Sequence, residues 1–366
     1  MRVLRVDALK RLVEIVPETT LDLLNVFRLV SVGDTLYSET SREVKKERAD
    51  GSYDSERVRL RIGVEVEKKT LEPMMRRIAF LGRIIYESRD LGLEGKYHSI
   101  HLSPGMPITI ESRQNFQRLN AFARHYKRSE KLVGGDLLVV LIDDEGISVI
   151  QIGRLGMKAL FEKKLVAAGK REPEERLRAV SMLYSGAANI LEKRLEEDES
   201  SEILVFGPSI FVDDFLQYLK RNKRGLLSRV RKTGYVSEGA SSGIGELLRN
   251  RMLHEYGERV KVVADAEAVE ELIAAMARDP ASVSVGLREC LRAVELGAAS
   301  RLLVDEAFLW EHLTESDVER LLDMAEKSGA AVQVIASGYE AADKIAALGG
   351  VAATLRYPLP PSTQNR

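Results

Sequence analysis

The first third of the chain alternates polar and apolar residues in the way that is typical of β-strands. The clearest run extends from Val58 to Val66, where nearly every second residue is apolar, as in a strand with one buried face. The same reading predicts two shorter strands at residues 97–102 and 108–111, and helices at residues 21–29 and 112–129. Several short strands with little helix predict a small β-barrel over residues 1–132.

After Gly134-Gly135 the pattern changes to strands and helices in alternation. The apolar run Leu137–Ile142, a turn and then Ile147–Ile150 predict a hairpin. A long helix is predicted at Glu172–Glu197, where Pro173 suits the first turn. A buried strand and a further helix follow at residues 203–206 and 208–221. This alternation predicts a central α/β domain over residues 133–258.

The last part of the chain predicts a third domain over residues 259–366. Its strands are expected at residues 301–304, 331–336 and 351–356. Its helices are expected at residues 266–277 and 283–296, and from Thr314, which has Asp317 in the capping-box position. The arrangement is that of a compact α/β/α sandwich. The whole chain is therefore predicted to be a multidomain α+β protein.

Length and composition fit this picture. A chain of 366 residues is expected to form two or three domains, and 45% hydrophobic with 30% charged residues is typical of a globular protein. The sequence has no apolar run long enough to span a membrane and no leader-like start, so a cytoplasmic protein without a membrane partner is expected. The single Cys290 rules out an internal disulfide and lies in an amphipathic pattern that predicts a packed thiol.

Charge is distributed unevenly along the chain. Residues 262–330 carry 15 acidic and 6 basic side chains, a net charge of −9, whereas residues 1–261 have a net charge of +7. A basic front and an acidic back indicate different partners, with nucleic acid the candidate for the front. The alternative is a chance scatter of surface charges.

Two basic segments are candidates for contact with RNA. Lys220–Lys232 contains seven basic residues and no acidic one, although a solvated helix end could also account for it. Its predicted contacts are Arg221, Lys223, Arg224, Arg229, Arg231 and Lys232. Ser41–Arg61 contains seven basic and five acidic residues around Asp50-Gly51-Ser52, which has the composition of a flexible tip between two strands. Its predicted contacts are Arg42, Lys45, Lys46, Arg48 and Arg57.

The motif with the most enzyme-like sequence is Gly239-Ala240-Ser241-Ser242-Gly243-Ile244-Gly245, which matches the glycine-rich turn of short-chain dehydrogenases. A strand at Arg259–Ala264, followed by Asp265, would complete that match. Against it, Arg229–Val236 is too charged for a buried central strand, and no Tyr-x-x-x-Lys follows the glycines. The alternative is a helix start capped by Ser241 or Ser242.

A metal site is a weaker hypothesis. His98 and His101 are three apart on a predicted strand and therefore point to opposite faces. The carboxylates Asp7, Glu14 and Glu18 could hold a hard divalent metal for phosphodiester cleavage, or could simply be surface residues. The identity of such a metal is unknown, and no other cofactor is required. No P-loop is present.

Motifs spread along the chain resemble those of the Pelota family. They are Val16–Leu24 with Leu29–Asp34, Gly95–Ile100, Ala240–Gly243, Val285–Leu287, Leu302–Glu306 and Gly350–Pro358. The resemblance implies an N-terminal Sm-like β-barrel, a central α/β domain and a C-terminal domain similar to kink-turn-binding ribosomal proteins. The family is similar to class I release factors, which hydrolyse peptidyl-tRNA through Gly-Gly-Gln. Here the two Gly-Gly pairs precede Asp136 and Val351, so peptide release is not expected.

The resemblance also implies a function and partners. It implies a monomer that enters stalled ribosomes with GTP-bound elongation factor 1-alpha, places residues 41–61 in the mRNA channel, and promotes subunit dissociation by an ABC-type ATPase. The carrier contacts carried over are Lys170, Arg171, Pro208 and Phe211, although the family's Pro-Gly-Phe turn reads Pro208-Ser209-Ile210-Phe211 here. Some members have been assigned a metal-dependent endoribonuclease activity. Whether this chain is an enzyme therefore stays open, with cleavage of stalled mRNA by the N-terminal domain as the alternative function.

Overall fold

The computed structural model describes residues 1–47, 53–132, 135–153, 156–165, 173–237, 243–257 and 260–360. The chain forms two compact units. Met1–Lys131 and Ala307–Glu315 form the first, and Leu132–Glu306 and Ser316–Arg366 form the second. Three separate sheets, one in each predicted domain, confirm the multidomain α+β class. The domain boundaries stay predictions.

An antiparallel seven-stranded sheet forms the N-terminal domain, in the order β1-β2-β7-β3-β4-β5-β6. Its strands are β1 (Arg2–Asp7), β2 (Leu12–Val16), β3 (Thr35–Glu47), β4 (Tyr53–Glu72), β5 (Arg77–Glu87), β6 (Tyr97–Leu102) and β7 (Ile108–Glu111). The alternation predicted for residues 58–66 lies within the longer β4. There Leu60, Ile62 and Val64 are buried, as expected for the core face of a strand.

Helix α1 (Thr20–Leu29) is fixed at both ends by polar contacts. Thr19 and Asp22 form a capping box at its start. At its end the Lys69 ammonium donates to the carbonyl oxygens of Phe27 and Val30 at 2.9 and 3.0 Å, and it lies 4.6 Å from the centre of the Phe27 ring. A cation at a helix C-terminus stabilises the exposed carbonyls and the helix dipole. The other helix of this part is α2 (Phe116–Leu132).

The Lys69→Met variant should therefore unfold more readily than the wild type. Methionine keeps the length of the side chain but cannot donate to the two carbonyl groups. We expect the free energy of unfolding of the N-terminal domain to fall by about 1–2 kcal/mol, measured by urea denaturation. The neighbouring Lys68 is exposed, so Lys68→Met is the matched control and should leave the stability unchanged. Equal stability of both variants would contradict the capping role of Lys69.

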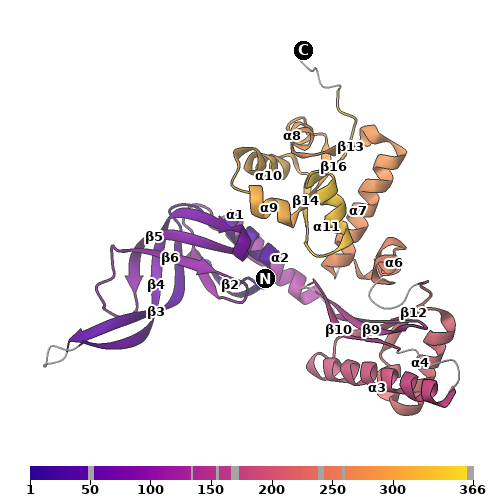
Figure 1. The fold of residues 1–366 in the computed structure, drawn as a ribbon. Coiled ribbons are helices and arrows are strands. Elements are labelled where there is room, and N and C mark those ends of the chain that lie inside the picture. The colour runs from indigo at the N-terminus through magenta and orange to yellow at the C-terminus, as the bar shows by residue number, and fades with distance from the viewer. Residues whose placement is uncertain are drawn as a thin grey trace. The chain divides into compact units, whose positions relative to one another are not determined.

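A five-stranded sheet, in the order β10-β9-β8-β11-β12, forms the central domain. Its strands are β8 (Leu137–Ile142), β9 (Gly146–Gly153), β10 (Gly156–Lys164), β11 (Glu202–Phe206) and β12 (Val230–Gly234). Every residue of β8 is buried because both faces of the sheet are covered. Helices α3 (Pro173–Glu197) and α4 (Ser209–Asn222) pack on one face (Figure 1), together with the short α5 (Arg224–Leu227). Helix α6 (Gly243–Arg249) packs on the other.

The charged segment at residues 229–236 is explained by its position in this sheet. It forms β12, which pairs with β11 alone among the described strands and therefore lies at the edge. An edge strand can expose charged side chains such as Arg231 to solvent, and these discourage pairing with another chain. The prediction that this segment is not a buried central strand is confirmed.

The four-stranded sheet of the C-terminal domain has the order β13-β16-β14-β15. Its strands are β13 (Val283–Val285), β14 (Ala299–Asp305), β15 (Ala331–Ile335) and β16 (Val351–Leu355). Helices α7 (Lys261–Arg278) and α11 (Glu340–Ala347) share a core with one face. Helices α8 (Leu287–Glu295) and α10 (Ser316–Ser328) pack against each other and against strands of this sheet (Figure 1). Helix α9 (Glu306–His312) follows β14 in the chain.

Two predicted elements of this region are wrong. The strand predicted at Arg259–Ala264 is instead the start of helix α7 from Lys261. The helix predicted at residues 283–296 begins as β13, and only after Gly286, with φ of +81°, does the chain enter α8. The prediction for Cys290 is confirmed, because its thiol is buried in α8 and burial raises its pKa to about 12.

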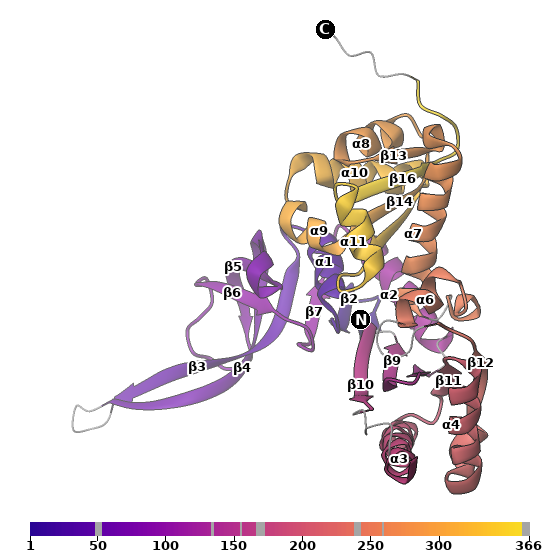
Figure 2. The same cartoon turned by 45° about the vertical axis from the view of Figure 1, so that its right-hand side comes forward.

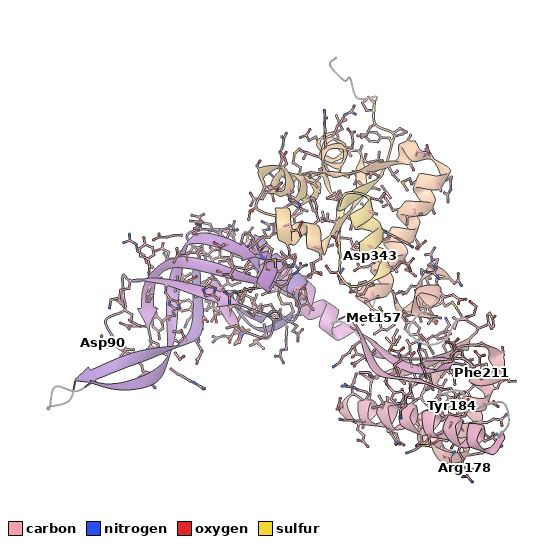
Figure 3. All side chains as sticks on the ribbon, in the orientation of Figure 1. Asp90, Met157, Arg178, Tyr184, Phe211 and Asp343 are labelled. Atoms are coloured by element: carbon pink, nitrogen blue, oxygen red, sulfur yellow. The ribbon has the colours of Figure 1, made fainter. Side chains whose placement is uncertain are left out.

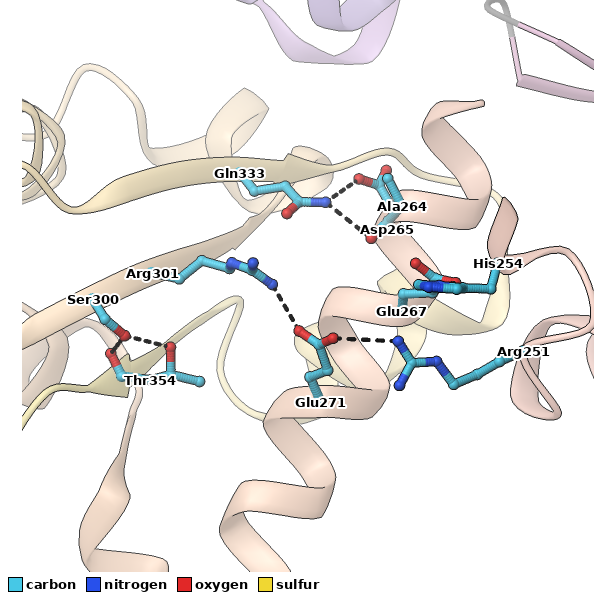
Figure 4. A network of polar contacts seen from close by, with 10 residues as sticks. All are labelled: Arg251, His254, Ala264, Asp265, Glu267, Glu271, Ser300, Arg301, Gln333 and Thr354. Atoms are coloured by element: carbon cyan, nitrogen blue, oxygen red, sulfur yellow. Dashed lines mark hydrogen bonds and ion pairs between the residues drawn. The ribbon is translucent and has the colours of Figure 1, made fainter. Parts of the chain in front are cut away.

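Polar contacts of α7 connect segments that are distant in sequence (Figure 4). Glu271 lies 3.0 Å from Arg301 of β14 and 3.6 Å from Arg251, while Glu267 lies 2.6 Å from Nδ1 of His254. Arg251 and His254 precede α7 in the stretch that packs on the central sheet through Leu253 and Tyr256. The helix therefore joins the central sheet to the C-terminal sheet within the second unit.

Candidate functional site

Strands β3 and β4 form a basic ribbon, defined as residues 41–47 and 53–61. Their pairing continues without interruption to Glu47 opposite Tyr53, and the two strands extend beyond the rest of their sheet (Figure 2). The segment thus has a strand on each side of its centre, as predicted, whereas the predicted tip at Asp50-Gly51-Ser52 and the candidate Arg48 lie outside the described residues.

The candidate cations of the ribbon occupy defined positions in this ladder. Arg42 pairs with Val58, Lys45 with Ser55 and Lys46 with Asp54. Arg57 is paired with Glu43 in the backbone register. The backbone pairing of the ribbon therefore places these positions at regular intervals along its two strands. That arrangement suits the regularly spaced phosphates of a nucleic acid.

The three candidate metal ligands are not brought together. Asp7 lies at the end of β1, where its carboxylate accepts from the backbone N–H of Lys10 and pairs with Arg5 at 2.9 Å. The Lys10 contact lowers the pKa of Asp7. Glu18 lies at the opposite end of the β1–β2 hairpin, 3.3 Å from the N-terminal ammonium, and Glu14 pairs with Arg5 across the hairpin. Among the described residues, no group of three histidine, cysteine or carboxylate side chains is placed to hold a metal ion.

The basic patch at residues 221–232, predicted to contact RNA, is divided by local contacts. Lys223 pairs with Glu192 at 2.6 Å, and Lys232 pairs with Glu255 at 2.7 Å and donates to the carbonyl oxygen of Met252. Arg229 donates to the carbonyl oxygen of Glu199. Arg221, Arg224 and Arg231 are exposed. The charge available to a polyanion on this surface is therefore smaller than the sequence indicates.

The candidate carrier contacts lie at the start of α4. Pro208 is the N-cap residue, and the backbone N–H of Phe211 donates to its carbonyl oxygen at 3.0 Å. Gly207 has φ of +154° and approaches the carbonyl oxygen of Ile142 so closely that a side chain would not fit. The glycine thus precedes Pro208 here, whereas the family's Pro-Gly-Phe turn has its glycine after the proline.

Phe211 also lines a cavity of about 420 Å³ beside the β8–β9 turn. The cavity is mostly apolar, and Tyr184 of α3 contributes to its wall. Figure 3 labels Tyr184 and Phe211 in the central domain. Three carboxylates also line the cavity, those of Asp143, Asp144 and Asp214. The other two candidates, Lys170 and Arg171, lie outside the described residues, as do Ser241 and Ser242.

Among the described residues, no helix combines the length and the apolar character that crossing a membrane requires.

Two family models match the chain. The one described as the Pelota N-terminal domain matches residues 1–122, and the one described as eRF1 domain 3 matches residues 262–359. A Pelota homologue of Pyrococcus abyssi is 28% identical over 346 residues, which cover 93% of this chain and 94% of the homologue. A homologue of Thermococcus kodakarensis is also 28% identical, over 356 residues that cover 94% of this chain and 96% of the homologue.

The structure is similar to two solved structures of the same family. The crystal structure of the Thermoplasma acidophilum Pelota protein has a TM-score of 0.63 at 20% identity and covers 98% of this chain and 100% of its own. The Archaeoglobus fulgidus Pelota structure has a TM-score of 0.53 at 22% identity and covers 99% and 100%. At these identities the likeness shows the fold, and it includes all three sheets.

Proposed function

The chain belongs to the Pelota family, and on that premise we propose that it recognises stalled ribosomes at the A site together with a GTP-bound elongation factor. It then promotes dissociation of the ribosomal subunits. It does not hydrolyse peptidyl-tRNA, since neither Gly-Gly pair is followed by glutamine. The match with Pelota relatives along nearly the whole chain is the observation that carries this proposal.

The basic ribbon supports the part of the proposal that concerns the decoding site. Its paired strands hold four of the five predicted RNA contacts in register: Arg42, Lys45, Lys46 and Arg57. A narrow two-stranded element that extends beyond its sheet is suited to enter a confined RNA channel, where cations offset the repulsion between phosphates. We therefore place the ribbon in the mRNA channel.

The other two domains supply the protein partners in this proposal. The carrier, elongation factor 1-alpha with GTP, binds the central domain near Pro208 and Phe211 and the segment with Lys170 and Arg171. An ABC-type ATPase then replaces the carrier and separates the subunits. The net charge of −9 over residues 262–330 favours a basic surface on the partner that docks there.

Co-sedimentation tests the proposal. Purified chain is mixed with archaeal ribosomes stalled on a truncated mRNA, with elongation factor 1-alpha and a non-hydrolysable GTP analogue. We expect the chain and the carrier to enter the ribosomal pellet together, with less of both when GDP replaces the analogue. A chain that stays in the supernatant under all these conditions would overturn the proposal.

The endoribonuclease hypothesis has a separate test. Labelled RNA is incubated with the chain and Mg²⁺ or Mn²⁺. Because Asp7 and Glu18 lie at opposite ends of the β1–β2 hairpin, we expect no cleavage that depends on these carboxylates. Cleavage by the wild type that is lost in Glu18→Ala would instead favour the nuclease.

A further inference from the structure

The outer face of the N-terminal sheet holds a second basic feature, which shares only Arg61 with the ribbon. It is a cavity of about 630 Å³, here called the tyrosine pocket. The pocket is lined by five cations, two tyrosines and one carboxylate, together with Leu9, Leu12 and Thr109; the charged and aromatic members are Arg5, Lys10, Arg11, Arg61, Arg113, Tyr37, Tyr86 and Glu111. All of them belong to Met1–Lys131, so the pocket lies within one unit. Its volume is that of a small-ligand site.

Strand register explains why the two tyrosines meet. Thr109, Tyr37, Gly63 and Tyr86 are paired in one row across β7, β3, β4 and β5. A Cβ at Gly63 would lie 2.7 Å from the Tyr37 ring and 3.0 Å from Cβ of Tyr86. Because Gly63 has no side chain, the tyrosine rings approach each other edge to face, with 5.9 Å between their centres.

Polar contacts fix Tyr37 and leave Tyr86 available. The Tyr37 hydroxyl donates to Glu111 at 2.9 Å, and burial together with this contact raises its pKa to about 12, so it stays protonated at neutral pH. Arg61 donates to Thr109 at 2.8 Å and lies 5.6 Å from the centre of the Tyr37 ring. Tyr86, in contrast, is 44% exposed. Its ring therefore offers a surface for stacking.

The cations of the pocket are only partly neutralised. Arg5 pairs with Asp7, and Arg11 donates to the carbonyl oxygen of Arg113. Within the described part of the chain, no carboxylate lies at ion-pair distance from Lys10 or Arg113. Both side chains are exposed. The pocket therefore combines an excess of positive charge with an accessible aromatic face.

From this combination we propose that the tyrosine pocket binds one unpaired nucleotide of single-stranded RNA. The base stacks on Tyr86, and Lys10, Arg11 and Arg113 contact the flanking phosphates. Proteins recognise unpaired nucleotides through this pairing of aromatic stacking with basic side chains. An acidic peptide would use the cations but not the exposed ring, which is why RNA is favoured. The inference rests on the proposed function, which brings this domain to RNA.

Fluorescence anisotropy with a labelled single-stranded RNA decamer tests the stacking. The full-length Tyr86→Ala variant should bind about tenfold more weakly than the wild type, and Tyr86→Phe should bind like the wild type because phenylalanine keeps the ring. Tyr97 is 53% exposed on the same domain and lies outside the pocket, so Tyr97→Ala is the matched control and should bind normally. Equal binding by Tyr86→Ala and Tyr97→Ala would overturn the proposal, as would weak binding by Tyr86→Phe.

Salt dependence tests the cations. In the Lys10→Ala/Arg113→Ala variant, the slope of log affinity against log salt should become shallower by about 1.4, which corresponds to two lost phosphate contacts on a single strand. Arg89→Ala/Lys96→Ala removes two exposed cations outside the pocket and should keep the wild-type slope. An unchanged slope in the first variant, or equally effective competition by a polyglutamate peptide, would contradict an RNA site.

Ribosome binding is measured in parallel so that the two proposals can fail separately. Wild-type chain that binds the decamer but not ribosomes would overturn the proposed function and leave the pocket standing. Ribosome binding with unaltered decamer binding by Tyr86→Ala would overturn the pocket alone. A defect of Tyr86→Ala on ribosomes with and without mRNA assigns the nucleotide to rRNA, and a defect only with mRNA assigns it to mRNA.

Discussion

Replacing Asp265 by alanine should lower the free energy of unfolding of the second unit by about 3 kcal/mol, the largest stability effect we expect from one substitution. The Asp265 side chain is fully buried. Its carboxylate accepts from Lys261 at 2.8 Å, from the side-chain amide of Gln333 at 2.9 Å and from the backbone N–H of Ala336 at 3.1 Å (Figure 4 shows the Gln333 contact). Alanine removes this acceptor from the half-buried donors of Gln333 and Ala336, of which the Gln333 amide keeps its bond to the carbonyl oxygen of Ala264 at 3.2 Å. Each lost hydrogen bond to a charged group costs about 1.5–3 kcal/mol.

Part of this cost is reduced by solvent. Lys261 is 34% exposed and also donates to the carbonyl oxygen of Val334, so its ammonium keeps a partner in the variant. Chemical denaturation followed by circular dichroism measures the difference. Asp323 is an exposed carboxylate on α10, and Asp323→Ala should change the stability by less than about 0.5 kcal/mol. If the two variants had equal stability, the buried carboxylate would not be a structural anchor.

The largest functional effect is expected from removing the cations of the basic ribbon. The triple variant Arg42→Thr/Lys45→Thr/Lys46→Thr should bind stalled ribosomes roughly 100-fold more weakly, since three charge-assisted contacts at about 1 kcal/mol each are lost. Threonine is chosen because it is a good strand former and should preserve the β3–β4 pairing. Binding is measured by filter capture over a range of salt concentrations, and the salt dependence should become weaker.

The matched control removes three exposed cations of the same domain that lie outside the ribbon, Lys68, Arg89 and Lys96. Their replacement by threonine changes the net charge by the same amount and should affect affinity much less. A control variant that is as defective as the ribbon variant would mean that ribosome binding depends on overall charge. That result would contradict the proposal that the ribbon itself contacts the mRNA channel.

Segments with strong local signals could be predicted from the sequence. The apolar run at residues 137–142 is β8, and the helix predicted at residues 172–197 is α3. The short helices α9 and α11 were not predicted, because one or two turns leave little periodicity to detect. The apolar start of α7 was predicted as a strand because Val260, Val262 and Val263 are β-branched, whereas packing on the central sheet favours the helix.

The tyrosine pocket could not be predicted from the sequence. Its residues lie on six different strands and in the turns beside them, and only the register of the sheet brings them together. One signal was available. Gly63 interrupts the alternation of β4, and a glycine inside a strand often marks the close approach of neighbouring groups. The predicted basic patch was overestimated for a related reason, because Glu192 and Glu255 neutralise Lys223 and Lys232 from distant parts of the sequence.

Ribosome dissociation tests the central claim most directly. Archaeal ribosomes stalled on a truncated mRNA are incubated with the chain, elongation factor 1-alpha with GTP, and the ABC-type ATPase with ATP, and are then separated on a sucrose gradient. The proposed function predicts that monosomes convert to subunits only when the chain is present, and that the peptidyl-tRNA stays intact. Monosomes that persist in the complete mixture, or peptide released by the chain without dissociation of the subunits, would contradict it.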